Sequence, residues 1–240
     1  MTTETLILPD AEAVAAEAAE RFAALLSAHP GERFSLALSG GSTPQRLHRL
    51  LTQTPWIERI DWSRVHIFLA DERQVPHDHP DSNYRMARET LLDHVPIPPD
   101  QIHPVPTAGA KPAEDALAYA DELAAYFGSD APAFDLILLG MGPDGHTASL
   151  FPGHTWPQGG TVIGVENSPK PPPRRISLSL EFINRARNVL FLVTGADKAE
   201  AVARVFSEGH GEGALPAGRI QPAGKLVWLL DQAAAARHAA

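Results

Sequence analysis

Uninterrupted apolar segments recur along this chain, and they restrict its fold more than any other feature of the sequence. The segments that we expect to form buried strands are residues 33–38, 65–70, 134–139, 188–195 and 225–231. An apolar run without polar alternation fits a strand that is buried on both faces. Because helical patterns lie between these runs, they predict a mostly parallel sheet with helices on both faces, in a single α/β domain over residues 1–240.

The predicted helices occupy the segments between the strands. They are residues 11–28, 44–52, 82–93, 113–127 and 197–208, with a short alanine-rich helix after residue 231. Ser82 is a favoured N-cap for the third of them, since its hydroxyl can accept a hydrogen bond from a backbone N–H of the first turn. Residues 161–165 and 175–180 are shorter β candidates.

Composition excludes several classes of protein. The chain has 240 residues, no cysteine and a formal net charge of −9. The absence of cysteine excludes disulfides and thiolate nucleophiles, and the acidic charge argues against a binder of nucleic acid or of a membrane surface. The N-terminus lacks the features of a signal peptide, and no apolar run approaches the roughly 20 residues that cross a bilayer. We therefore expect a cytoplasmic protein. Because the chain is acidic overall, an anionic ligand would need a local cluster of basic groups.

Polar motifs follow three of the predicted strands. They are "SGGSTP" at 39–44, "DERQVP" at 71–76 and "GMGPDGHTASLFPG" at 140–153. Ligands bind beyond the carboxyl ends of the strands in open parallel sheets, so the three motifs together predict one site at that edge.

The first two motifs suit an anion. Gly40 and Gly41 can expose backbone N–H groups, and Thr43 as N-cap with Pro44 as first helical residue would place a helix N-terminus beside them. Arg73 can bind two oxygens of a phosphate at once. A plain strand-to-helix turn and a charged loop with an internal ion pair remain the structural alternatives, and the roles of Asp71 and Glu72 stay open.

The third motif has two functional interpretations. Its first six residues fit G-x-G-x-x-G, the dinucleotide fingerprint, but Pro143 removes a backbone donor and too little helix follows. The alternative is a catalytic loop, in which His146 moves a proton near neutral pH and Asp144 orients it or holds a water. A structural histidine is the remaining possibility. We favour the catalytic loop over the dinucleotide cradle.

Two further loops carry candidate ligands. "HDHPD" at 77–81 has histidines and aspartates, but no second cluster completes a zinc site, so we expect no metal. "SPKPPPRR" at 168–175 is either a stiff surface loop or a rigid arm that holds Lys170 over a site.

Seven motifs in their order along the chain resemble the 6-phosphogluconolactonase family. They are "LSGGSTP", "ADERQVP", "HPDSNYRMARETLL", "GMGPDGHTASLFPG", "SPKPPPRRISL", "LFLVTGADKAEAV" and "GKLVWLLD". The resemblance implies a Rossmann-like fold shared with glucosamine-6-phosphate deaminase and ribose-5-phosphate isomerase. It also implies hydrolysis of 6-phospho-D-glucono-1,5-lactone to 6-phosphogluconate, without a metal or a nucleotide cofactor.

The resemblance also assigns roles to residues. His146 would be the general base on water, and Asp144 would orient it. The residues that would hold the substrate and its phosphate are Gly40, Gly41, Ser42, Thr43, Arg73 and Lys170. We expect the sugar-phosphate lactone as the ligand and a monomer as the state in solution, with an oligomer left open.

The alternative within this fold is a sugar-phosphate isomerase or deaminase. In deaminases the loop after the histidine resembles Ala-Phe-Asn-Glu-Pro, which supplies an extra carboxylate. Here "TASLFPG" follows His146 instead, and Arg73 stands where an aromatic residue follows the Asp-Glu pair in deaminases. A sugar-phosphate sensor of a transcription regulator fits less well, because no helix-turn-helix segment precedes the domain.

Overall fold

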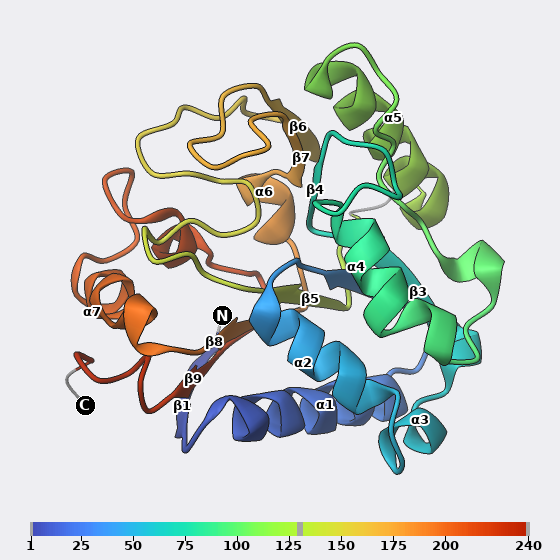
Figure 1. The fold of residues 1–240 in the computed structure, drawn as a ribbon, viewed down its shortest axis with the longest axis horizontal. Coiled ribbons are helices and arrows are strands. Elements are labelled where there is room, and N and C mark those ends of the chain that lie inside the picture. Colours follow the sequence, from blue (N-terminus) through green and yellow to red (C-terminus); the bar gives the residue numbers. More distant parts are fainter. Residues whose placement is uncertain (1, 129–131, 239–240) are drawn as a thin grey trace.

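The structure is a computed structural model that describes residues 2–128 and 132–238. Its main feature is a six-stranded sheet in which every pair of neighbours is parallel (Figure 1). In sheet order the strands are β1 (Thr2–Leu8), β9 (Lys225–Asp231), β8 (Asn188–Val193), β5 (Leu136–Leu139), β2 (Phe34–Leu38) and β3 (Val65–Leu69). All side chains of β2 and β5 are buried, as their unbroken apolar sequences predict.

A second, three-stranded antiparallel sheet lies beside the first. It consists of β4 (Asp71–Arg73), β7 (Arg175–Leu178) and β6 (Val162–Val165), in that order. Because β4 follows β3 after one residue, the small sheet begins at the carboxyl edge of the large one.

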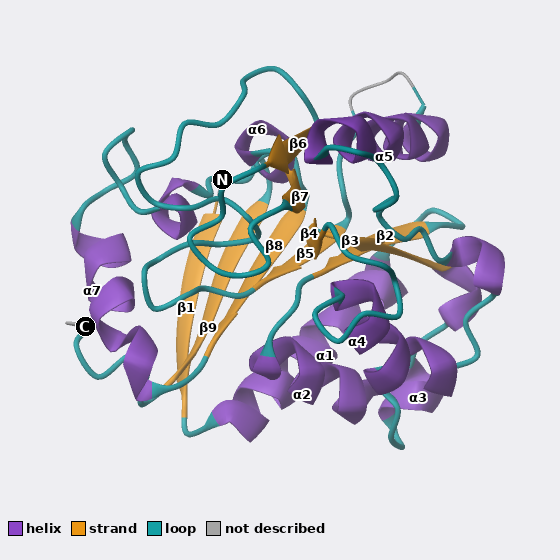
Figure 2. Cartoon of the chain, turned by 45° about the horizontal axis from the view of Figure 1, so that its top comes forward, coloured by secondary structure: helices purple, strands orange, loops and turns teal. Residues whose placement is uncertain are grey.

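Helices cover both faces of the large sheet (Figure 2). The helices in the described ranges are α1 (Ala11–Ala28), α2 (Ser42–Leu51), α3 (Trp56–Arg59), α4 (Asn83–Thr90), α5 (Pro112–Phe127), α6 (Leu180–Ile183) and α7 (Ala199–Ser207). Helices α1 and α2 lie on one side, and α6 and α7 lie toward the other. No helix in the described ranges is long and apolar enough to cross a membrane; the cytoplasmic location stays a prediction.

The predicted α/β class with a mostly parallel sheet is confirmed, and so are the five main strands and five main helices. Ser82 caps α4 as predicted, its hydroxyl accepting a hydrogen bond from the Arg85 N–H. The prediction of an alanine-rich helix after residue 231 is wrong, because residues 232–237 form turns. The Asp231 carboxylate accepts hydrogen bonds from the N–H groups of Ala234 and Gly195, which holds the start of this segment in a turn. A segment of this length does not form a stable helix without tertiary support.

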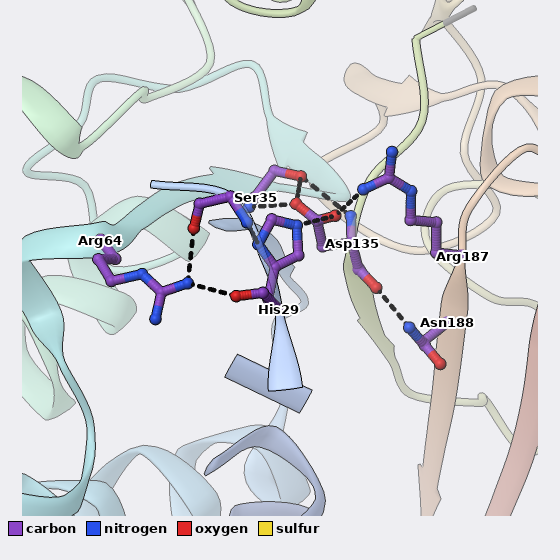
Figure 3. A network of polar contacts seen from close by, with 7 residues as sticks. His29, Ser35, Arg64, Asp135, Arg187 and Asn188 are labelled. Atoms are coloured by element: carbon purple, nitrogen blue, oxygen red, sulfur yellow. Dashed lines mark hydrogen bonds and ion pairs between the residues drawn. The ribbon is translucent and has the colours of Figure 1, made fainter. Parts of the chain in front are cut away.

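At the amino-terminal edge of the sheet, Asp135 ties three neighbouring strands together (Figure 3). Its carboxylate accepts hydrogen bonds from the N–H and the hydroxyl of Ser35, at 2.9 and 2.8 Å. His29 Nε2 lies 3.1 Å and Arg187 Nη1 2.5 Å from its other oxygen. This network lies at the opposite end of β5 from the motif at 140–153.

We expect Asp135→Ala to lower the free energy of unfolding by about 2–4 kcal/mol, because the buried Ser35 N–H and hydroxyl would lose their acceptor. Urea denaturation measures the change. Asp121→Ala, which removes an exposed carboxylate from α5, is the matched control. Equal stability of the two variants would contradict a structural role for this network.

Candidate active site

A cavity of about 250 Å³ opens at the carboxyl ends of β2, β5 and β8. Three polar segments that are far apart in the sequence meet in it, as predicted for this edge of the sheet. Of the residues proposed as site residues, those that line the cavity are Gly40, Gly41, Ser42, Thr43, Arg73, His146 and Lys170. Asp144 stands directly behind His146.

The loop after β2 forms one end of the cavity. Gly41 has φ +113°, a left-handed backbone that glycine adopts without penalty, and α2 begins at the next residue. The prediction that Thr43 is the N-cap is therefore wrong. The Thr43 hydroxyl is instead hydrogen-bonded to the Thr194 hydroxyl at 2.7 Å, which ties the start of α2 to the end of β8. The N–H groups of the first turn of α2 have no acceptor within the helix and favour an anion.

Lys198 adds a cation to the cavity that the sequence reasoning missed. It lies between β8 and α7, its Nζ is 2.8 Å from Asp197 Oδ2, and it lines the cavity together with Thr194. A signal was present, since "ADK" at 196–198 directly follows the predicted strand at 188–195, at the same sheet edge as the other motifs.

Arg73 also lines the cavity, from β4. Its Nη1 donates to the backbone carbonyl of Asp81 at 2.7 Å, which holds the side chain in place. Its buried Nε has no hydrogen-bond partner within the described part of the chain. A buried donor of a charged group without an acceptor is costly, so this nitrogen can gain from an anionic ligand.

The proline-rich segment is an arm that is fixed by Arg175. This guanidinium donates to the backbone carbonyls of Lys170, Pro171 and Pro172 at 3.2, 3.1 and 2.8 Å. The arm places Lys170 Nζ 3.3 Å from both Asp144 Oδ1 and His146 Nδ1. Lys170 thus reaches the proposed catalytic pair, as the rigid-arm interpretation expects.

Asp144 and His146 form a close pair. Asp144 Oδ1 lies 2.5 Å from His146 Nδ1, so Nδ1 carries the proton of the imidazole and donates a hydrogen bond to the carboxylate. The contact of Lys170 with Nδ1 is then electrostatic rather than a hydrogen bond, since both groups are donors. This tautomer leaves Nε2 with a lone pair that can take a proton.

The surroundings shift the pKa values of both members of the pair. Burial is the main reason that the pKa of His146 lies below its usual 6.5; Asp144 opposes this shift and Lys170 adds to it. Burial acts to raise the pKa of Asp144, but the hydrogen bond with His146 and the charge of Lys170 hold it below its usual value. At neutral pH the pair is therefore a carboxylate and a neutral imidazole.

The loop that carries this pair is a tight turn. Gly142 N–H donates to the His146 carbonyl at 2.9 Å, and Gly145 N–H donates to the Gly142 carbonyl. Gly145 has φ +79°. Residues 140–153 contain no helix, so the strand–turn–helix context that the dinucleotide fingerprint requires is missing.

Asp71 and Glu72, whose roles the sequence left open, are used differently. Glu72 is buried and accepts hydrogen bonds from the N–H groups of Asn83 and Tyr84 and from the Ser82 hydroxyl, so it supports the start of α4. Its burial raises the pKa of its carboxyl group. Asp71 lines the cavity and accepts a hydrogen bond from the Ser149 hydroxyl at 2.7 Å.

In the histidine-rich loop at 77–81, local contacts occupy the side chains. His77 Nε2 donates to the Val105 carbonyl at 2.8 Å, and His79 Nδ1 accepts from the Asp81 N–H at 3.1 Å. Across residues 2–128 and 132–238, no group of three or more histidine, aspartate and glutamate side chains is arranged to hold a metal ion.

Comparison with known proteins decides the family. The model of the family described as glucosamine-6-phosphate isomerases/6-phosphogluconolactonase matches residues 9–228. The chain belongs to this family. Within the glucosamine-6-phosphate isomerase/6-phosphogluconolactonase family, it is 49% identical over 205 residues to a 6-phosphogluconolactonase of Synechocystis, which covers 83% of this chain and 82% of the relative. It is 41% identical over 247 residues to a 6-phosphogluconolactonase of Mycobacterium leprae, at 99% coverage of both chains.

A solved structure of the same family agrees with the fold. The 6-phosphogluconolactonase from Trypanosoma cruzi superposes with a TM-score of 0.88 at 29% identity, over 100% of this chain and 99% of the other.

Proposed function

We propose that this protein hydrolyses 6-phospho-D-glucono-1,5-lactone to 6-phosphogluconate, with His146 as the general base on water. The observation that carries the proposal is the Asp144–His146 pair, 2.5 Å apart, in a cavity whose other walls bear anion-binding groups. The names of the relatives at 49% and 41% identity support this substrate.

The proposed chemistry uses His146 twice. Nε2 takes a proton from a water molecule as the water oxygen attacks the lactone carbonyl carbon. The tetrahedral intermediate then collapses, the bond between that carbon and the ring oxygen breaks, and the imidazolium returns the proton to the departing ring oxygen. Asp144 holds the tautomer and stabilises the imidazolium, and such acid–base assistance contributes about 10²–10⁴ in rate. Orientation of the bound lactone contributes further acceleration.

The phosphate would lie at the end of the cavity formed by the loop after β2. There Gly40, Gly41, Ser42 and Thr43 offer backbone and hydroxyl donors at the N-terminus of α2. Arg73 and Lys198 supply positive charge on other walls of this cavity, in a chain whose net charge is −9. Lys170, beside the catalytic pair, steadies the negative charge that develops on the carbonyl oxygen.

The deaminase alternative makes a different demand on the loop. It needs an extra carboxylate after the histidine, and residues 147–153 contain none. A lactonase assay with the spontaneous rate subtracted tests the choice. Hydrolysis of the 6-phosphorylated lactone above background supports the proposal, whereas release of ammonia from glucosamine 6-phosphate without lactone hydrolysis would overturn it. The monomeric state stays a prediction.

We expect Arg73→Ala to raise KM for the phosphorylated lactone about 10- to 100-fold with a smaller change in kcat, because a charged hydrogen bond to the substrate is lost. The preference for phosphorylated over free gluconolactone should fall by a similar factor. Arg174→Ala is the matched control, since Arg174 pairs with Glu166 outside the cavity. Steady-state kinetics with both lactones measure the difference, and an unchanged preference would show that Arg73 does not contact the phosphate.

A further inference from the structure

Directly after His146 the chain makes a tight turn at 147–150 with a strained backbone. The Leu150 N–H donates to the Thr147 carbonyl at 2.9 Å and closes the turn. Ala148 has φ +46° and is the one non-glycine residue in the left-handed region within the described part of the chain. A side chain with a Cβ opposes this conformation, so surrounding contacts must hold it.

Buried hydrogen bonds supply that restraint. The Ser149 hydroxyl donates to Asp71 Oδ2 at 2.7 Å, and the Ser149 N–H donates to the Ser177 hydroxyl at 3.2 Å. The Thr147 hydroxyl donates to the Gly140 carbonyl at 2.8 Å. Ser149 is only 1% exposed and Asp71 6%. The turn is thus bound to β4, to β7 and to the end of β5, and the contact with Asp71 is the one that involves a charged group.

The turn is connected to His146 through the backbone and through a contact between two rings. The His146 carbonyl, which leads into the turn, accepts the Gly142 N–H, and the His146 ring lies against Phe151 on the other side of the turn at a centroid distance of 4.9 Å. A change in the backbone at Ala148 would therefore move the peptide that carries the imidazole. It would leave the loop after β2, the other end of the cavity, in place.

We propose that Asp71 is a positioning residue that acts through the Ser149 hydroxyl, holding the strained turn at Ala148 and thereby the place of the His146 imidazole. The inference rests on the proposed lactone hydrolysis at His146. It gives a function to a cavity-lining carboxylate that the proposed proton transfers do not use. The competing role for Asp71 is direct contact with the reacting atoms of the substrate.

Kinetics separate the two roles. We expect Ser149→Ala to lower kcat about 10- to 100-fold, with KM changed less than about threefold, because the base is displaced while the phosphate end is intact. Asp71→Ala should lower kcat in the same way. The double variant should be little worse than either single variant, since each substitution removes the hydrogen bond from the Ser149 hydroxyl to Asp71. Asp71→Asn keeps an acceptor for Ser149 and should restore most of the kcat lost in Asp71→Ala.

Ser179→Ala is the matched control, because it removes an equally buried hydroxyl that donates to Gly160 and does not touch the turn. It should leave kcat unchanged even where it lowers the melting temperature. The inference is overturned if Ser149→Ala retains the wild-type kcat, or if Asp71→Asn loses as much activity as Asp71→Ala. Should Asp71→Ala fail to fold, the comparison of Ser149→Ala with Asp71→Asn still decides.

A readout without turnover distinguishes this inference from the proposed function. The ring 15N signals of His146 report its surroundings in the free protein. The charge of Asp71 also acts on the pKa of His146, so the signals are compared at a pH at which the imidazole is neutral in every variant. There we expect Ser149→Ala to shift them, and we expect Asp71→Asn and Ser179→Ala to leave them near their wild-type positions. An inactive wild-type protein would refute the proposed function alone, whereas unshifted signals in Ser149→Ala would refute the positioning role alone.

Discussion

Replacing His146 with alanine is expected to lower kcat for the phosphorylated lactone by about 10³-fold, within the range that general acid–base catalysis contributes. The loop after β2 and Arg73 are unchanged by this substitution, so KM should move far less than kcat. His154→Ala is the matched control, because His154 lies in the same loop and contacts Phe151, but it does not line the cavity. A His146→Ala variant that keeps the wild-type rate above background would remove His146 from the mechanism.

The dependence of kcat/KM on pH tests the same role of His146. A general base must be neutral, so kcat/KM falls as pH drops through the pKa of His146. Burial lowers that pKa, and we therefore expect the acid limb below the usual imidazole value of 6.5. Asp144→Asn removes an anion that favours the imidazolium and should move the limb to still lower pH. Lys170→Met removes a cation that disfavours it and should move the limb to higher pH. Limbs that move in the opposite directions would contradict the assignment.

The sequence was sufficient for the parts of the fold that depend on unbroken apolar runs and on helical periodicity. Strands β2, β5, β8 and β9 are buried on both faces, and their runs of apolar residues say so directly. Strand β1 was missed, because an edge strand with alternating exposed positions carries no such run. Strand β4 was missed because its three residues, all charged, form a strand only by pairing with β7. Both omissions are strands defined by their partners rather than by their own composition.

The candidate site was predictable where a motif follows a strand, and not where two distant segments meet. Asp144 and His146 are two residues apart, so their pairing is local and could be anticipated. The contact of Lys170 with that pair, across 24 residues, was one of two interpretations of a proline-rich segment. The bond between Asp71 and Ser149 spans 78 residues and depends on the pairing of β4 with β7. The sequence indicated β6 and β7 as β candidates at 161–165 and 175–180, but not β4 or this pairing.

Gly142 lies so close to the proposed catalytic pair that a side chain at this position is expected to lower kcat strongly. A Cβ at this position would lie 2.0 Å from His146 Nδ1 and 2.5 Å from Asp144 Oδ1, far inside van der Waals contact. These are side-chain atoms, so the chain can relieve the clash by moving the imidazole and the carboxylate apart, without unfolding. Their hydrogen bond depends on the space that glycine leaves.

Gly142→Ala is therefore expected to lower kcat by about 10²-fold or more, while circular dichroism and the melting temperature change little, because a displaced base loses its alignment with the attacking water. Gly213→Ala is the matched control, since Gly213 is exposed and a Cβ there would meet nothing within 4 Å. The acid limb of kcat/KM should also move to lower pH in Gly142→Ala, because the imidazole moves away from the carboxylate that favours its protonated form. A variant with near wild-type kcat and an unchanged limb would mean that the 2.5 Å contact between Asp144 and His146 does not set the rate, and the general-base role would then need a different orienting group.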